Sequence, residues 1–273
     1  MEGSLSGFYH SPEGAIIMVE PILDISHYQK RYGDTIAVRD LSLTVEPGDI
    51  YGFIGHNGAG KTTLIRSIVG VQPFNQGSIH VAGIDITADP VAAKRLIAYV
   101  PDNPDVYEFM TGLQYLTFIA DIFEVPTRDR QARIESLASR LELTDALASP
   151  IASYSHGMRQ KLVVIGALLH EPKLLVLDEP FVGLDPLASH ELKTMLHELA
   201  ERGGAVFFSS HVLEVVEKLC NKVAIIRKGE IVAAGTTDEV RGDDTLEEVF
   251  LELAEEADRT GANPAPSTSS EQR

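Results

Sequence analysis

Residues 55–62 read Gly-His-Asn-Gly-Ala-Gly-Lys-Thr, which matches the pattern G-x-x-x-x-G-K-[ST]. The apolar run 50–54 before it indicates a buried strand, and the pattern of 64–69 indicates a helix leaving it. Glycines in such a loop let the backbone wrap around phosphates, and the helix start adds partial positive charge. The stretch therefore predicts a P-loop that binds a nucleoside triphosphate with Mg²⁺.

The residues of this loop are expected to have distinct roles in binding the nucleotide. Lys61 is expected to reach the β- and γ-phosphates, and the Thr62 hydroxyl to ligate Mg²⁺. His56 stands at a variable position of the pattern and is expected to be passive. The residues expected to bind the nucleotide in this loop are Gly55, His56, Asn57, Gly58, Ala59, Gly60, Lys61, Thr62 and Thr63.

Carboxylates and a histidine follow two further predicted strands. The apolar run 174–177 ends in Asp178 and Glu179. In P-loop enzymes an Asp at this point holds Mg²⁺ opposite the P-loop Thr, and the next carboxylate can act as general base toward water. His211 follows the strand predicted at 205–209, at the end where α/β sheets bind ligands.

The segment 154–161, Tyr-Ser-His-Gly-Met-Arg-Gln-Lys, stands just before a helical pattern over 162–169. Ser155 is expected to cap that helix. Its hydroxyl and the free N–H groups of a helix start can also form a second phosphate site. The capping role and the phosphate-binding role are compatible.

Composition limits the classes of function. The chain has 273 residues, with 23 Lys+Arg against 40 Asp+Glu and a formal net charge of −17, which argues against a nucleic-acid surface. The single cysteine, Cys220, lies in an apolar segment and is expected to be a buried thiol in a reducing cytosol. No stretch approaches the ~20 apolar residues that span a bilayer, so we expect a soluble chain.

The pattern along the chain predicts an α/β fold. We expect a P-loop NTPase core, with a mixed sheet flanked by helices and an N-terminal antiparallel β portion, over 18–254, and a helical subdomain inserted at about 103–165. Residues 1–17 and 255–273 are expected to be a disordered extension and a disordered acidic Ser/Pro tail. The strands are predicted at 22–25, 41–45, 50–54, 79–81, 97–100, 174–177, 205–209, 223–226 and 231–234.

Taken together, these motifs resemble the ATP-binding cassette (ABC) family of transporter ATPases over about residues 22–253. Tyr32 is similar to the aromatic residue that stacks on adenine, with Ala37 packing nearby. The other motifs of the resemblance are Walker A at 55–63, the signature segment at 154–160, Walker B at 174–179, the D-loop at 183–185 with Asp185, and the switch histidine His211.

The resemblance implies an ATPase whose site needs two cassettes, facing head to tail. Each ATP would lie between Walker A of one cassette and the signature segment of the other. It further implies a separate integral-membrane permease as partner, a place on the cytoplasmic face of the membrane, and no nucleic acid. The residues that would contact the partner's ATP are Ser155, His156, Gly157 and Met158.

The chain departs from the family pattern at Asp102 and within the signature segment. Asp102 stands where most members have Gln; a carboxylate can still ligate Mg²⁺ or contact the attacking water, although its proximity to Glu179 would disfavour double ionisation. The signature segment departs at three positions, but Ser155 and Gly157 remain, so its function is expected to be retained. The three departures are Tyr154, His156 and Met158.

Segments 107–113, 236–240 and 246–251 resemble single-cassette ATPases of bacterial drug, antibiotic and lipid exporters. The pattern at 246–253 is equally consistent with a short helix that simply docks on the body. The main alternative is a soluble ABC ATPase serving ribosomes, DNA or cofactor assembly. A P-loop kinase or GTPase is a third, disfavoured by 154–160 and Glu179.

Overall fold

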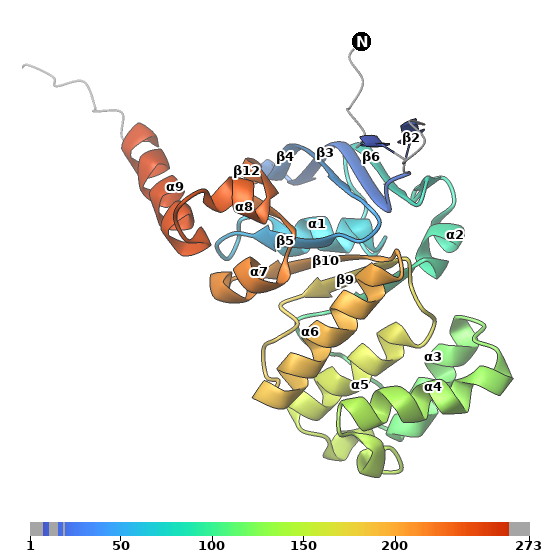
Figure 1. Cartoon of the computed structure of the whole chain (residues 1–273). Helices are drawn as coiled ribbons and strands as arrows, with labels where there is room; N and C mark the ends of the chain where they lie inside the picture. The colour runs from blue at the N-terminus through green and yellow to red at the C-terminus, as the bar shows by residue number, and fades with distance from the viewer. Residues whose placement is uncertain (1–7, 11–15, 19, 262–273) are drawn as a thin grey trace, which may run out of the picture.

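The computed structural model describes residues 8–10, 16–18 and 20–261, and its centre is a six-stranded sheet (Figure 1). The inner strands are buried on both faces, as their continuous apolar sequences require. All neighbours in this sheet run parallel except the edge hairpin β11–β12. In spatial order the strands are β12 (Glu230–Thr236), β11 (Lys222–Arg227), β5 (Ile50–Ile54), β10 (Ala205–Ser210), β9 (Leu174–Asp178) and β8 (Ile97–Val100).

An antiparallel sheet of four strands forms a second layer, and helix α1 (Lys61–Ile68) lies between the two sheets (Figure 1). Apolar side chains from both sheets and α1, among them Tyr28, Phe53 and Leu64, make one buried core cluster. The strands of this sheet are β4 (Thr35–Val45), β3 (Leu23–Tyr32), β6 (Gln76–Val81) and β7 (Ile84–Asp85).

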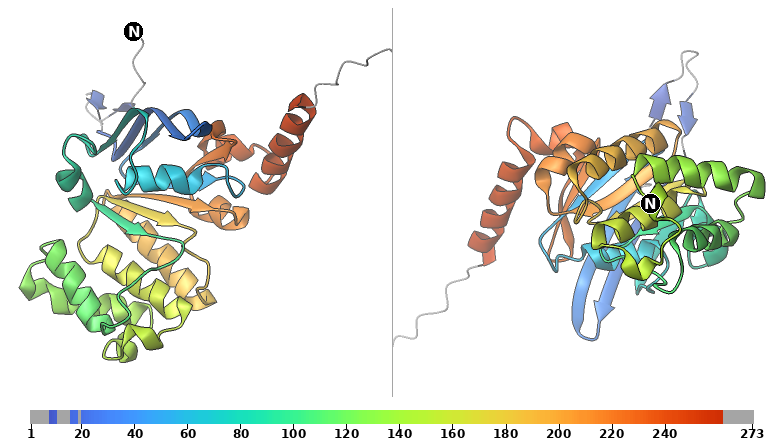
Figure 2. Two further views of the ribbon diagram at one scale, coloured as in Figure 1. Left: turned by 180° about the vertical axis from the view of Figure 1, so that it is seen from behind. Right: turned by 90° about the horizontal axis from the view of Figure 1, so that it is seen from below.

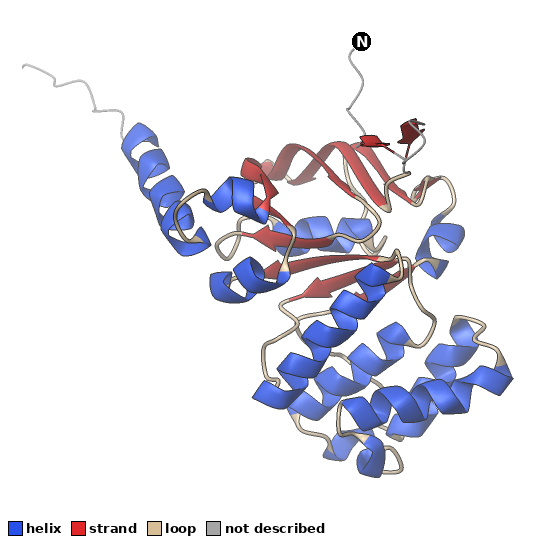
Figure 3. Ribbon diagram, viewed as in Figure 1, coloured by secondary structure: helices blue, strands red, loops and turns tan. Residues whose placement is uncertain are grey.

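Helices cover the other face of the six-stranded sheet and continue into a helical lobe, which contains no strands in Figure 3. A second buried cluster joins this lobe to the sheet. The remaining helices are α2 (Pro90–Arg95), α3 (Gly112–Ile122), α4 (Thr127–Arg140), η1 (Thr144–Ala146), η2 (Ile151–Ser153), α5 (His156–Leu168), α6 (Pro186–Glu201), α7 (Leu213–Leu219), α8 (Thr237–Arg241) and α9 (Leu246–Gly261).

The structure confirms the predicted strands, and the last two of them pair as a hairpin around Lys228-Gly229. It also confirms the burial of Cys220, whose thiol pKa is raised by that burial. No helix in the described part of the chain is both long enough and apolar enough to cross a bilayer.

Two segments that were expected to be disordered contain described secondary structure. Within 1–17, short strands β1 (Phe8–His10) and β2 (Ile16–Met18) pair antiparallel, because aromatic and β-branched residues favour strands. Within 255–273, α9 continues to Gly261 because Ala and Glu are good helix formers. This helix stands out from the body in both views of Figure 2. Residues 262–273, and 1–7 and 11–15 at the other end, lie outside the described residues.

His170 connects the helical lobe to the core. Its ring stacks on Phe123, at the end of α3, with centroids 3.7 Å apart, and its Nε2 donates to the carbonyl of Ile97 on β8 at 3.3 Å. Burial lowers its pKa to about 4. Its Nδ1 is buried with no hydrogen-bond partner in the described structure, so a proton there would have no acceptor. The connection therefore requires a neutral imidazole.

We predict that His170 makes the protein less stable as pH falls from 6.5 toward 4. Over this range the unfolded chain takes up a proton that the folded chain refuses, so the folded state loses stability. His170→Gln keeps a donor for Ile97 but does not titrate. Between pH 7 and pH 5, the free energy of unfolding should fall by about 1–2 kcal/mol more in the wild type than in this variant.

The measurement is urea unfolding at both pH values. His190→Gln, at an exposed histidine on α6, controls for the loss of a histidine as such. Equal losses in the wild type and His170→Gln would contradict the prediction.

Candidate active site

Three parallel strands bring the predicted site residues to one edge of the sheet. β10 lies between β5 and β9, with Ser210 opposite Ile54 and Ser209 opposite Asp178. The P-loop follows β5, His211 follows β10 and Glu179 follows β9. Because parallel strands end at the same edge, these groups converge there.

The phosphate loop has the backbone that its glycines permit. Gly60 has φ +114°, and a Cβ there would lie 2.8 Å from a methyl group of Val38. A Cβ on Gly55 would lie 2.5 Å from the carbonyl oxygen of Ile226. The N-cap of α1 is Gly60, which has no side chain to offer, so the first N–H groups of α1 remain available to an anion.

Lys61 is folded back into the loop and is almost fully buried. Its Nζ donates to the carbonyl oxygen of Gly55 at 2.5 Å and to that of His56 at 3.3 Å. Burial lowers its pKa, and the nearby charges of Glu179 and Asp178 partly oppose that shift. The loop therefore positions a cation where phosphate charge would be bound.

Thr62 and Asp178 form the pair that can hold Mg²⁺. The Thr62 hydroxyl donates to Asp178 Oδ2 at 2.9 Å, and Asp178 is 1% exposed. Hydroxyl and carboxylate oxygens are the hard donors that Mg²⁺ prefers, with phosphates and water completing its shell. The described residues contain no group of three His, Cys, Asp or Glu able to hold a metal.

Sequence reasoning missed Ser209, although it is fully buried at the centre of the site. Its hydroxyl donates to Asp178 Oδ1 and accepts from the backbone N–H of Glu179 at 3.3 Å. In the sequence it looks like an ordinary core position of a strand. Its role follows from the register of β10 on β9, which places Ser209 opposite Asp178 and is not displayed by a single sequence.

Glu179 and His211 form a second pair of side chains at this edge. His211 Nδ1 lies 2.8 Å from Glu179 Oε2, and the His211 backbone N–H donates to the same oxygen at 3.3 Å. Glu179 has φ +50°, and its N–H also donates to the Ser209 carbonyl at 3.2 Å. The carboxylate is thereby held in one orientation and can accept a proton.

This pair borders a cavity of about 300 Å³ beside the phosphate loop. Phe250 of α9 was not predicted here, yet its ring contacts that of His56, with centroids 4.6 Å apart. The amphipathic pattern at 246–253 predicted a docked helix but not the surface it covers. The cavity is lined by Ile54, Gly55, His56, Asn57, Glu179, His211, Leu213 and Phe250.

The other predicted residues of this edge lie around the loop. Tyr32 is half exposed on the β3–β4 hairpin and its hydroxyl donates to Gln72 Oε1 at 2.5 Å. The Ala37 carbonyl lies beside Gly60. Asp102 follows β8 and accepts from the backbone N–H of Asn103 at 2.9 Å; it has no described hydrogen bond to the Thr62–Asp178 pair.

The segment 155–158 does not line this cavity. Ser155 caps α5, accepting from the Met158 backbone N–H at 3.2 Å. His156 lies against Gly183, where an added Cβ would meet its ring at 2.5 Å. Asp185 caps α6, accepting from Ala188 N–H at 2.8 Å. The structure thus keeps the segment apart from the phosphate loop of its own chain.

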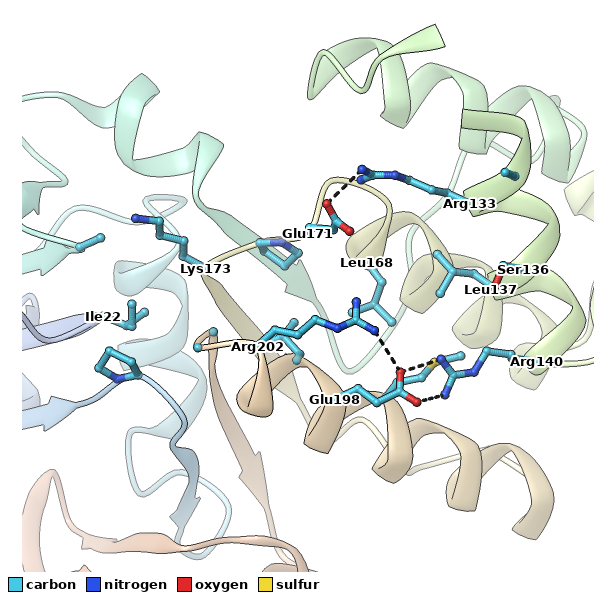
Figure 4. A pocket seen from close by; sticks show the side chains of 18 of the residues that line it. Ile22, Arg133, Ser136, Leu137, Arg140, Leu168, Glu171, Lys173, Glu198 and Arg202 are labelled. Atoms are coloured by element: carbon cyan, nitrogen blue, oxygen red, sulfur yellow. Dashed lines mark hydrogen bonds and ion pairs between the residues drawn. The ribbon is translucent and has the colours of Figure 1, made fainter. Parts of the chain in front are cut away.

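A larger cavity, of about 880 Å³, lies between α4 and the end of α6 and is lined by none of these residues (Figure 4). The charges along it are largely paired. Arg140 points at Glu198, with an ion pair of 2.8 Å, and Arg133 at Glu171, with one of 3.0 Å. By its lining residues, this cavity is a cleft between the helical lobe and the core.

The comparisons with known proteins agree with this site. The model of the family described as ABC transporter matches residues 38–182. The chain belongs to this family. It is 38% identical to the uncharacterized ABC transporter ATP-binding protein YdbJ of Bacillus subtilis (strain 168), over 86% of this chain and 75% of YdbJ.

Two further comparisons relate this ABC protein to a curated relative and to a solved structure. It is 32% identical to the linearmycin resistance ATP-binding protein LnrL of Bacillus subtilis (strain 168), over 86% of this chain and 77% of LnrL. A solved structure of the ATP-binding subunit of an ABC transporter superposes with a TM-score of 0.83 at 32% identity, over 85% of this chain and 99% of that one. The predicted P-loop NTPase fold is confirmed.

We predict that Ser209→Ala raises the Mg²⁺ concentration needed for ATP hydrolysis and lowers the free energy of unfolding by about 1–3 kcal/mol. The reason is that it leaves buried Asp178 with one donor fewer. Ser210→Ala is the matched control: it is the next buried serine on β10, and its hydroxyl accepts from Val212 N–H instead. An equal Mg²⁺ requirement in both variants would contradict the role given to Ser209.

Proposed function

We propose that this ABC ATP-binding subunit hydrolyses ATP to drive export through a separate integral-membrane permease. The observation that carries the proposal is the Glu179 carboxylate, held by His211 at a cavity beside the phosphate loop and next to the Thr62–Asp178 pair. A base, a phosphate loop and a metal pair at one edge suit attack of water on a γ-phosphate.

In this proposal the residues of one chain bind and orient the nucleotide. Lys61 and the loop 55–63 hold the phosphates, while Tyr32 and Ala37 contact the adenine. Thr62 and Asp178, with Asp102 nearby, would hold Mg²⁺, which neutralises phosphate charge when bound. Glu179 takes the proton of the attacking water as the bond between the β- and γ-phosphates breaks, and ADP and phosphate leave.

A second copy of the chain would complete the site. Ser155, His156, Gly157 and Met158 present a helix N-terminus that does not line the cavity of their own chain, and Asp185 stands nearby. Such a helix start suits phosphate bound in a partner. ATP that contacts both cassettes only when they are closed shifts the equilibrium toward closure.

Export through a permease is supported by resemblance. LnrL, by its name, serves resistance to linearmycin, and segments 107–113 and 246–251 resemble exporter ATPases. The place of work would be the cytoplasmic face of the cell membrane, reached through the permease. Co-purification with a membrane protein supports this role; full ATPase activity without any membrane partner supports a soluble ABC ATPase instead.

We predict that Glu179→Gln abolishes steady-state ATP turnover, with a loss of at least about a hundredfold, because the amide cannot accept the proton. ATP-dependent dimers should accumulate, since binding stays intact while hydrolysis stops. Phosphate release and size-exclusion chromatography with ATP measure the two effects. Glu214→Gln, on exposed α7, is the control. Near-normal turnover in Glu179→Gln would remove Glu179 from the role of base.

We predict that Asp102→Ala lowers permease-coupled activity more than it lowers nucleotide affinity. Asp102 stands at the end of β8, apart from the hydrogen bonds of the Thr62–Asp178 pair. Asp102→Gln restores the residue that most family members carry and should keep the coupling. The measurements are ATP binding and permease-stimulated hydrolysis. Equal loss of both in Asp102→Ala would make Asp102 simply a metal ligand.

A further inference from the structure

The first turns of α5 contact the segment 179–185 that follows β9 in the same chain. This segment begins with Glu179 and ends with Asp185, the cap of α6. Gly157 is so close to it that an added Cβ would lie 2.7 Å from the carbonyl of Gly183. The His156 ring lies against the same Gly183. The helix that bears Ser155 and the loop that bears Glu179 are therefore packed together.

Gln160 contacts the start of the segment. Its Nε2 donates to the carbonyl oxygen of Pro180, the residue after Glu179, at 3.4 Å. The side chain is 1% exposed, and its Oε1 has no partner in the described structure. A buried amide with one unsatisfied oxygen is unfavourable for stability, and an apolar side chain would avoid that cost. The one described hydrogen bond of this side chain is with the backbone that follows Glu179.

Lys161 contacts the end of the segment. Its Nζ lies 2.9 Å from Asp185 Oδ2, and its side chain is only 11% exposed. The pKa of Asp185 is lowered by the hydrogen bond from Ala188 N–H and by Lys161. An ammonium beside the N-terminus of α6 is unfavourable toward the helix dipole, so its location depends on Asp185. The pair fixes the far end of the segment to α5.

The segment between these two points is a turn whose Phe181 ring lies 6.0 Å from that of Phe208 and 5.6 Å from Lys193 Nζ of α6. Glu179 itself has φ +50° and Gly183 has φ +82°. Within the turn, Val182 N–H donates to the Glu179 carbonyl at 3.2 Å and Leu184 N–H to the Phe181 carbonyl at 3.4 Å. Ser209 and His211 hold Glu179 from the sheet side. On the helical side the segment contacts α5 through Gln160 and Lys161, and α6 through Lys193.

We propose that Gln160 and Lys161 are positioning residues for Glu179, holding segment 179–185 against α5 so that the carboxylate keeps its orientation at the cavity. The inference rests on the proposed ATPase function. One consequence is that the N-terminus of α5 and Glu179 in each chain are mechanically coupled. A shift of α5, whose N-terminus would face the partner's ATP, moves the turn that carries the chain's own base. A displacement of the base by about 1 Å can reduce rate by about a hundredfold.

The test is a double-mutant cycle with Lys161→Met and Asp185→Asn. Asn at position 185 still caps α6, so it removes the ion pair and spares the helix start. Lys161→Arg preserves the ion pair. Lys218→Met, which removes an exposed lysine paired with Glu214 on α7, is the control for charge. The measurements are kcat and KM for ATP, Tm, and ATP-dependent dimer formation in the Glu179→Gln background.

We expect Lys161→Met to lower kcat by about 10- to 100-fold with KM for ATP and Tm nearly unchanged. Lys161→Arg should restore most of kcat, and the double variant should be no slower than Asp185→Asn alone. Dimers should still form in the Glu179→Gln background, because Ser155 and the phosphate loop are untouched. A normal kcat in Lys161→Met, or effects that multiply in the double variant, would overturn the positioning role.

A wild-type chain that neither hydrolyses ATP nor dimerises with it would instead overturn the proposed function. The two failures are therefore distinguishable. Gln160→Leu provides a second, independent variant: a loss of kcat without loss of ATP affinity supports the same role. A loss of ATP affinity alone contradicts it.

Discussion

The carboxylate of Asp178 is the group on which the organisation of the site depends. It is 1% exposed, and a buried carboxylate is costly unless hydrogen bonds compensate for its lost hydration. Thr62 and Ser209 provide those bonds from two other parts of the chain. The hydrogen bonds to Asp178 thus hold the start of α1, the end of β9 and the end of β10 against one another. The phosphate loop, Glu179 and His211 derive their relative positions from that arrangement.

Much of this could be predicted from sequence, for physical reasons. The strands β5, β9 and β10 are continuous apolar runs with glycine or charged residues at their ends, so their limits are sharp. Ser155 and Asp185 are residue types typical of helix N-caps, and each caps a helix in the structure. The convergence of Glu179 and His211 follows from parallel strands alone. Such local signals, combined with the rule for parallel sheets, were enough to predict the fold and most of the candidate site.

What could not be predicted depends on register and on packing between distant segments. Ser209 acts through its place opposite Asp178, and a single sequence does not display the pairing of β10 with β9. His56 looked passive because its loop position is variable, yet Phe250, almost two hundred residues away, packs on it. The end of α9 was missed for a different reason. Acidic residues that suggest disorder are also good helix formers, and composition alone does not decide between the two.

The arrangement of α5 suits the proposed site, which would be divided between two chains. Its N-terminus, with Ser155, is exposed and does not line the cavity beside the phosphate loop of its own chain, while Gln160 and Lys161, one turn further on, contact the loop after Glu179. At its other end, His170 joins the helical lobe to β8 through Phe123 and Ile97. A rigid helix anchored at both ends transmits displacement rather than absorbing it. In the proposed dimer, a contact made at Ser155 by the second cassette would therefore reach the loop after Glu179 through Gln160 and Lys161.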